Sequence, residues 1–123
     1  MTAECFPRRL RLLSATDFKQ VFASACKAGN PHLTILVRAN GLAHPRLGMA
    51  ISRKVVRRAV ARNRIKRQLR EYFRHHQLQI GNLDLVILCK PGIDKLDKPA
   101  LRETVASCFG YMFKRCKPAC TNP

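Results

Sequence analysis

Residues 61–74, ARNRIKRQLREYFR, constrain this chain more than any other stretch because two side-chain patterns run through them together. Six of the fourteen side chains are basic and only one is acidic. The apolar side chains recur every three or four residues, a spacing that gathers them on one face of an α-helix. They are Ala61, Ile65, Leu69, Tyr72 and Phe73. We therefore predict a helix that packs an apolar face into a core and turns a basic face away from it.

The basic face of this predicted helix has almost no acidic partner. It is formed by Asn63, Arg67, Arg70 and Arg74, with Arg62 and Lys66 on its flanks. The preceding SRKVVRR adds four cations, so ten of the 24 Lys and Arg residues lie between positions 53 and 74. A solvated helix usually mixes charge signs at i,i+4, and here only Arg67 and Glu71 could pair in that way. Because guanidinium groups bind phosphate through paired hydrogen bonds, the pattern favours a polyanionic partner over a merely solvated face.

The composition indicates one folded and strongly basic domain. The chain has 123 residues, a formal net charge of +17 and 46% hydrophobic residues, which is too apolar for a disordered basic tail. We expect residues 1–117 to form a single globular domain and residues 118–123 to form a loose tail. Such a charge favours nucleic acid as the partner, with an anionic membrane surface second. The membrane is disfavoured because the apolar face of residues 61–74 is needed to cover a sheet.

Periodicity and turn residues place the elements before and after the basic helix. A helix is expected to follow Ser14, where the chain resembles a capping box, and to extend to the stop at 29–31. Short aliphatic runs predict two adjacent strands at 32–40 and 46–52, and a buried strand at 83–90.

The remaining helical signals complete an order of α-β-β-α-β-α. The basic helix is expected to span about 57–79, and a last helix begins at the N-cap Asp97 with Pro99 in its first turn. Helices and strands in this order predict an α+β fold in a single domain.

The titratable residues do not form a recognisable catalytic or metal site. Seven acids are scattered along the chain, and four histidines show no pattern for acid–base chemistry. The six cysteines contain no C-x-x-C pair, and the N-terminus lacks a signal-peptide pattern, so we expect reduced thiols and a cytoplasmic location. A zinc site of Cys116 and Cys120 with Cys5 or a histidine is the alternative, although its spacing matches no common structural site. We expect no catalytic residue, metal ligand or organic cofactor in the protein.

The string ISRKVVRRAVARNRIKRQLREYFR, above all Arg62-Asn63-Arg64 followed by Lys66-Arg67, resembles the signature of the bacterial ribonuclease P protein subunit. The likeness extends to FPRRLRLLSATDFKQVF and PRLGMAIS before it, and to LDLVILCKPG and the last helix after it. It covers roughly residues 6 to 114 in one register.

This resemblance implies a fold and a function. The fold would be an α/β sandwich on a small mixed sheet with a left-handed βαβ crossover, like the second domain of ribosomal protein S5. The function would be that of the protein subunit of a ribonucleoprotein that removes 5′ leaders from precursor tRNA. In that family the RNA subunit supplies the catalytic site with bound Mg²⁺, and the protein binds both that RNA and the leader. The implied partners are therefore the catalytic RNA and precursor tRNA, with no membrane and no obligate protein partner.

The resemblance also implies which residues touch each RNA. Contacts to the catalytic RNA would come from Arg62, Asn63, Arg64, Lys66, Arg67 and Arg70. Contacts to the precursor-tRNA leader would come from Phe18, Phe22, Thr34, Leu36, Arg53 and Lys54. This chain departs from the family in two places: many members have an aromatic residue where Leu36 stands, and others have a glycine where this chain has Val55-Val56.

Other interpretations stay open at this stage. Phe18 and Phe22 lie one helical turn apart, which suits either a base-stacking platform or an ordinary core pair. The composition fits a structural ribosomal protein or other rRNA-binding protein equally well. A DNA-binding regulator would require sequence-selective duplex binding, and the chain has no short helix-turn-helix pattern to support it.

Overall fold

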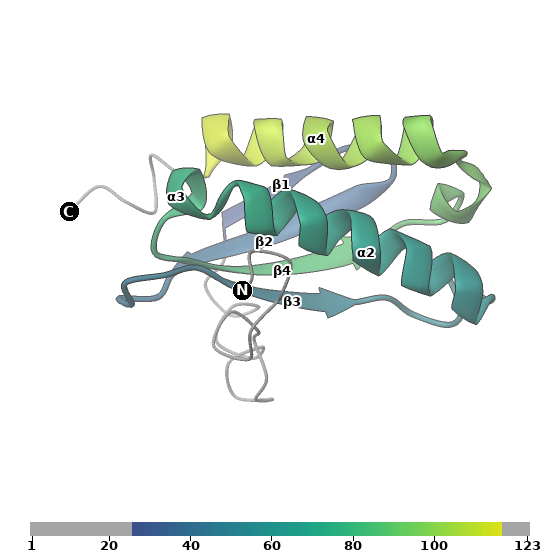
Figure 1. Ribbon diagram of the computed structural model, residues 1–123, viewed down its shortest axis with the longest axis horizontal. Helices are drawn as coiled ribbons and strands as arrows, with labels where there is room; N and C mark the ends of the chain where they lie inside the picture. Colours follow the sequence, from purple (N-terminus) through teal and green to yellow (C-terminus); the bar gives the residue numbers. More distant parts are fainter. Residues whose placement is uncertain (1–25, 117–123) are drawn as a thin grey trace.

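The computed structural model describes residues 26–116 and shows a four-stranded mixed sheet with its helices on one side (Figure 1). The strands are β1 (Cys26–Gly29), β2 (Leu33–Ala39), β3 (Arg46–Ala50) and β4 (Leu83–Cys89), in the spatial order β1-β2-β4-β3. β2 pairs antiparallel with both β1 and β4, whereas β3 and β4 are parallel. The α+β class and the mixed sheet are as predicted. The predicted first helix, with Phe18 and Phe22, and the tail at 118–123 lie outside the described residues.

Two predictions about the strands were wrong. The runs at 32–40 and 46–52 were expected to be adjacent strands, but β4 lies between β2 and β3. Residues 83–87 of β4 are all buried, and a strand with such a continuous buried run belongs in the centre of a sheet. Residues 26–29, expected at the end of a helix, form strand β1, because pairing with β2 outweighs a local helical period.

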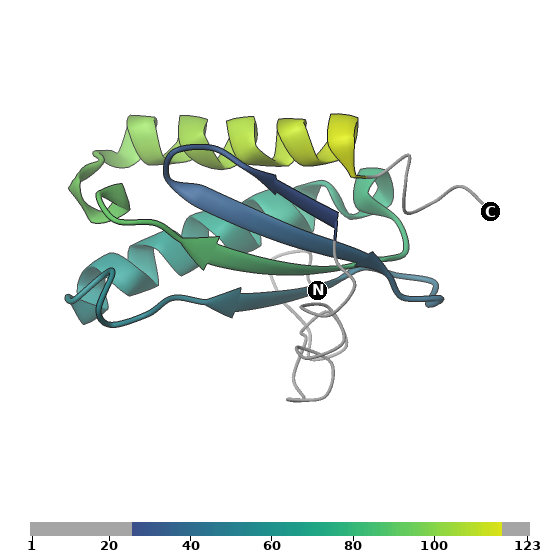
Figure 2. The same cartoon turned by 180° about the vertical axis from the view of Figure 1, so that it is seen from behind.

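The two long helices, α2 (Ala59–His75) and α4 (Lys98–Arg115), lie side by side against the same face of the sheet (Figures 1 and 2). A 3-10 turn, η2 (Ile93–Lys95), links β4 to α4. Asp97 caps α4 as predicted: its side chain accepts a hydrogen bond from the Ala100 N–H at 2.9 Å, and Pro99 stands in the first turn.

The predicted helix at 57–79 is interrupted at His76. Beyond this residue a short helix, α3 (Gln77–Ile80), continues to Gly81. The His76 backbone leaves the helical region at φ −117° and ψ 20°. Its ring stacks on Tyr72 with centroids 3.8 Å apart, and its Nδ1 lies 2.8 Å from the Tyr72 carbonyl. Gly81, with φ 77°, ends the segment close to the predicted helix end at residue 79.

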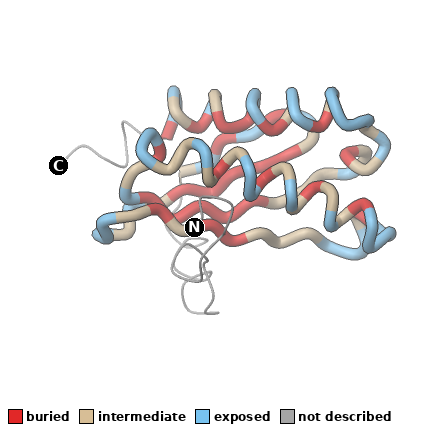
Figure 3. Tube along the Cα trace, viewed as in Figure 1, coloured by how far each residue is buried: buried red, intermediate tan, exposed pale blue. Residues whose placement is uncertain are grey.

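The core lies between the helices and the sheet (Figure 3). Side chains alternate along each strand, so one set of residues faces the helices and the other set faces away. Burying each large core side chain contributes roughly 1.5 to 3 kcal/mol to stability. Fully buried core residues include Leu33, Ile35, Leu85 and Ile87 from the sheet, Ile65, Leu69 and Phe73 from α2, and Leu101, Phe109 and Met112 from α4.

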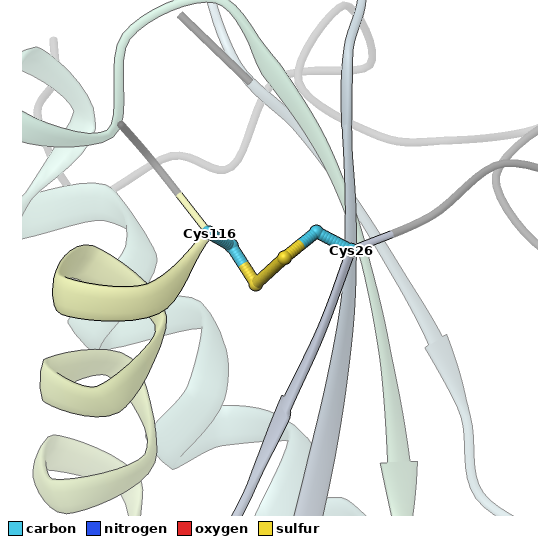
Figure 4. The surroundings of a disulfide bond; sticks show 2 residues. All are labelled: Cys26 and Cys116. Atoms are coloured by element: carbon cyan, nitrogen blue, oxygen red, sulfur yellow. A yellow bond between two sulfur atoms is a disulfide. The ribbon is translucent and has the colours of Figure 1, made fainter. Parts of the chain in front are cut away.

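The expectation that all the cysteines stay reduced was wrong for one pair. Cys26, at the start of β1, and Cys116, directly after α4, form a disulfide with their Cα atoms 5.6 Å apart (Figure 4). Ninety positions separate them in sequence. Burial raises the pKa of the free thiols of Cys89 to about 11 and of Cys108 to about 12, so both stay protonated near neutral pH.

Within the described part of the chain, no helix is both long and apolar enough to span a membrane.

Candidate nucleic-acid interface

The α2 helix has the two faces that the sequence predicted. Ala61, Ile65, Leu69 and Phe73 are buried against the sheet and α4. The opposite side carries exposed polar and basic residues, which are Asn63, Arg67 and Arg70, with Lys66 half-buried beside them. A helix whose apolar face is committed to the core must leave this basic face to solvent or to a partner.

The positive charge on the basic face of α2 is hardly neutralised by acidic side chains of the same helix. The first turn of the helix contains no acid, and its last turn adds Arg74 and His75. Glu71 has the spacing to pair with Arg67, yet residues 26–116 contain no ion pair between them. Like charges one turn apart destabilise an isolated helix. Their retention on an exposed face is typical of a surface that binds a polyanion.

The three residues of the Arg62-Asn63-Arg64 motif lie in different surroundings: the two arginines contact backbone carbonyls, and the asparagine is exposed. Arg62 Nη1 donates to the carbonyl oxygens of Val56 and Arg57 at 2.9 and 2.8 Å, so this side chain folds back over the start of α2. Asn63 is exposed. The sequence pattern placed Asn63 on the basic face and Arg62 on its flank, and it gave no signal of the backbone contacts.

Arg64 reaches away from the basic face toward the segment after β4. Its Nη2 lies 3.4 Å from the carbonyl oxygens of both Asp94 and Leu96, which makes these long and weak hydrogen bonds. Its Nε is buried and has no hydrogen-bond partner among residues 26–116. Such an unsatisfied buried donor is rare in folded proteins.

The predicted leader-binding residues of β2 lie on the sheet face turned away from α2 and α4, which we call the distal face (Figure 2). Thr34 and Leu36 are 5% and 9% exposed. Strand pairing places Leu36 between Lys27 of β1 and Val86 of β4. Where many family members have an aromatic residue, this chain therefore has the aliphatic side chain of Leu36 on the distal face.

The predicted leader-binding residues Arg53 and Lys54 lie at the same end of the sheet as Thr34. The register aligns Ala50 of β3 with Leu88 of β4, and Leu88 with Thr34. Arg53 and Lys54 follow the end of β3, and both are exposed. The structure thus brings Thr34, Arg53 and Lys54 to one end of the sheet, whereas Phe18 and Phe22 lie outside the described residues.

The turn that carries Arg53 and Lys54 explains the second departure from the family pattern. The Ser52 carbonyl accepts hydrogen bonds from the N–H groups of Val55 and Val56 at 3.1 and 2.9 Å. The Val56 side chain is fully buried in the core. A glycine at this position would leave that space empty. In this chain, the turn into α2 is therefore stabilised by the buried Val56 side chain and does not depend on the conformational freedom of a glycine.

The described residues do not offer a magnesium site. Residues 26–116 contain no group of three or more His, Cys, Asp or Glu side chains that could hold a metal ion. Their one fully buried carboxylate, Asp84, is already bound by Arg46 and Asn40.

Comparison with known families decides between the interpretations that the geometry leaves open. The sequence model of the family described as "Ribonuclease P" matches residues 6–112. The chain belongs to the ribonuclease P protein family. It is thus a protein component of ribonuclease P, the ribonuclease that processes the 5′ leader of precursor tRNA.

Relatives in this family cover most of the chain. The ribonuclease P protein component of Methylococcus capsulatus is 43% identical over 111 residues, which are 90% of this chain and 87% of that protein. The one from Vibrio cholerae is 48% identical over 101 residues, which are 82% and 86% of the two chains. The solved ribonuclease P protein of Thermotoga maritima, in complex with 1-(4-fluorophenyl)-2-thiourea, superposes with a TM-score of 0.70 at 30% identity, covering 79% and 94%. The Staphylococcus aureus protein, at 24% identity and a TM-score of 0.76, covers 82% and 93% and supports the fold.

Proposed function

We propose that this chain binds the catalytic RNA of ribonuclease P on the basic face of α2 and holds the 5′ leader of precursor tRNA against the distal face of the sheet. It would thereby assist RNA-catalysed, Mg²⁺-dependent endonucleolytic cleavage that leaves the mature tRNA 5′ end. The observation that carries this proposal is the exposed face of α2, where Arg67 and Arg70 form no ion pair with an acid among residues 26–116.

The contacts to the catalytic RNA follow from that face. Asn63, Arg67 and Arg70 point away from the core and can reach phosphate and ribose hydroxyl groups, which are the groups by which structured RNA is recognised. Lys66 lies on the flank of this face. Arg62 and Arg64 would reach the RNA from positions held by backbone carbonyls.

The leader contacts rest on the alignment of elements at one end of the sheet. Thr34 and Leu36 would supply polar and aliphatic contacts, and Arg53 and Lys54 would supply positive charge beyond β4, at the end of the sheet where Thr34 lies. A positive groove next to flat contacts is the usual way to hold a single strand. Phe18 and Phe22 would complete this site as stacking platforms.

Magnesium would be held by the RNA rather than by this chain, because the described residues do not fit a metal site. Bound to the RNA, the ion would supply activation of the attacking water and stabilisation of the developing negative charge. The part of this chain is to bind and orient the two RNAs, and neither a catalytic side chain nor an organic cofactor is assigned to it.

Finer features of the fold belong to the same proposal. A left-handed β3–α2–β4 crossover, as in the second domain of ribosomal protein S5, is supported by Figure 1: β3 and β4 run in the same direction, α2 lies in front of the sheet, and β4 lies above β3.

We further propose a single domain over residues 1–117 with a tail at 118–123, a cytoplasmic location, and no membrane or obligate protein partner.

Reconstitution with the catalytic RNA and a precursor tRNA tests the function. Cleavage is measured at low magnesium concentration with RNA alone, protein alone and both together. We expect a large increase in leader removal only when both are present. A structural ribosomal protein would leave the rate unchanged, and cleavage by the protein alone would contradict the absence of a catalytic site.

A further inference from the structure

A second cationic site lies at the β1 edge of the sheet, apart from the basic face of α2. It is a groove of about 610 Å³ between strand β1 and the last turns of α4. Its polar lining comprises Lys27, Thr34, Lys90, Tyr111, Lys114 and Arg115, and we call it the β1-edge groove. Because β1 is an outer strand and α4 packs against β1 and β2, this groove lies at the edge of the sheet where β1 meets α4.

The described lining of this groove has four cations and no carboxylate. None of the four forms an ion pair with another residue in the 26–116 region. Lys90 is held at the turn between β1 and β2, where its Nζ donates to the Asn30 carbonyl at 2.7 Å. Lys114 and Arg115 also complement the dipole at the end of α4, but that role does not account for Lys27 and Lys90.

An aromatic side chain stands among these cations. Tyr111 is 52% exposed, although tyrosine has an apolar ring that a purely structural role would bury. It precedes Lys114 and Arg115 by three and four residues, so all three side chains share one face of α4. Cations together with an exposed aromatic ring are the combination that binds single-stranded nucleic acid, through phosphate contacts and base stacking.

The β1-edge groove is continuous with the proposed leader site. Thr34 belongs to both, and Lys27 of the groove pairs across the strands with Leu36 of the leader site. A strand lying on the distal face can therefore pass Thr34 and continue around the edge of β1 toward α4. The Cys26–Cys116 disulfide adjoins Lys27 and Arg115 in sequence and joins the two sides of the groove.

We propose that the β1-edge groove binds single-stranded RNA, with phosphates on Lys27, Lys90, Lys114 and Arg115 and a base stacked on Tyr111. This inference rests on the proposed function and extends it: the groove takes the part of the 5′ leader that lies farthest from the cleavage site. A short leader ends before it reaches α4, whereas a long leader enters the groove.

The test compares leader lengths in the reconstituted holoenzyme. Binding of precursor tRNAs with leaders of about 4 and about 16 nucleotides is measured for the wild type and for Lys114→Ala/Arg115→Ala. We expect the double variant to weaken binding of the long-leader substrate by about tenfold and to leave the short-leader substrate within about twofold. Lys98→Ala/Arg102→Ala is the matched control, because it removes the same charge from exposed positions of α4 outside the groove.

Tyr111 gives a second measurement that does not depend on charge. Tyr111→Ala should weaken binding of the long leader selectively, and Tyr111→Phe should retain it because the ring still stacks. Equal binding of both leaders by wild type and variants would overturn the groove while leaving the proposed function intact. A wild-type protein that fails to stimulate the catalytic RNA would instead overturn the proposed function itself.

Discussion

Arg46 on β3 and Asp84 on β4 form a two-point ion pair across the parallel strands, with Nε to Oδ1 at 2.8 Å and Nη2 to Oδ2 at 2.7 Å. The Asp84 carboxylate is fully buried and also accepts a hydrogen bond from Asn40 Nδ2 at 2.9 Å. The pair thus ties the outer strand β3, which leads into the basic helix, to the centre of the sheet.

Replacing Arg46 with Ala should destabilise the fold by about 3 to 5 kcal/mol, because it leaves a buried carboxylate without its cation. Urea unfolding followed by circular dichroism measures the loss. Arg57→Ala, which removes an exposed Arg of the loop before α2, should change stability by no more than about 0.5 kcal/mol. An Arg46→Ala variant as stable as this control would show that solvent or another group compensates Asp84.

The Cys26–Cys116 disulfide should make the oxidised protein more stable than the reduced protein by about 2 to 4 kcal/mol. The bond closes a loop across 90 positions and so restricts the unfolded chain more than a short loop would. The check is the urea midpoint with and without reductant. In Cys26→Ser the reductant should have no effect, and a wild-type midpoint that does not respond to reductant would contradict the cross-link.

Cys108 should make stability depend on alkaline pH. Its thiol is buried, lies 3.8 Å from the Leu33 carbonyl and has a pKa raised by burial from 9.0 to about 12. The folded state therefore holds the proton more tightly than the unfolded state, so this contribution is full below pH 9 and is lost as the pH rises toward 12. Cys108→Ser removes the thiol, and the fall in its melting temperature between pH 9 and 11 should be shallower than that of the wild type. Parallel curves would show that Cys108 does not titrate in this range.

Local periodicity predicted what local forces determine. The buried face of α2, from Ala61 to Phe73, and the Asp97 cap of α4 depend on side chains within a turn or two of one another, so the sequence pattern was sufficient. The basic face opposite was predicted for the same reason. Which residues of α2 are buried and which are exposed follows directly from the helical repeat.

Contacts between distant segments were not predictable in this way. The insertion of β4 between β2 and β3, and the cross-link between Cys26 and Cys116, arise only when the whole sheet is assembled. The same holds within the site, where Arg64 turns toward carbonyls 30 and 32 positions away. Helical periodicity predicts on which side of the helix each side chain lies, but it does not predict which of these side chains a distant loop will contact.

Arg67 provides the most direct test of the basic face, since its side chain is exposed and unpaired with Glu71 in the described structure. Arg67→Ala should weaken association with the catalytic RNA and lower the slope of log affinity against log salt by about one counterion, because one phosphate contact is lost. Glu71→Gln should act in the opposite direction, because it removes the acid nearest to Arg67 on this helix. Affinities measured across a salt series separate the two effects. Arg102→Ala on α4 serves as the control for net charge, and an identical slope for Arg67→Ala and Arg102→Ala would remove Arg67 from the interface.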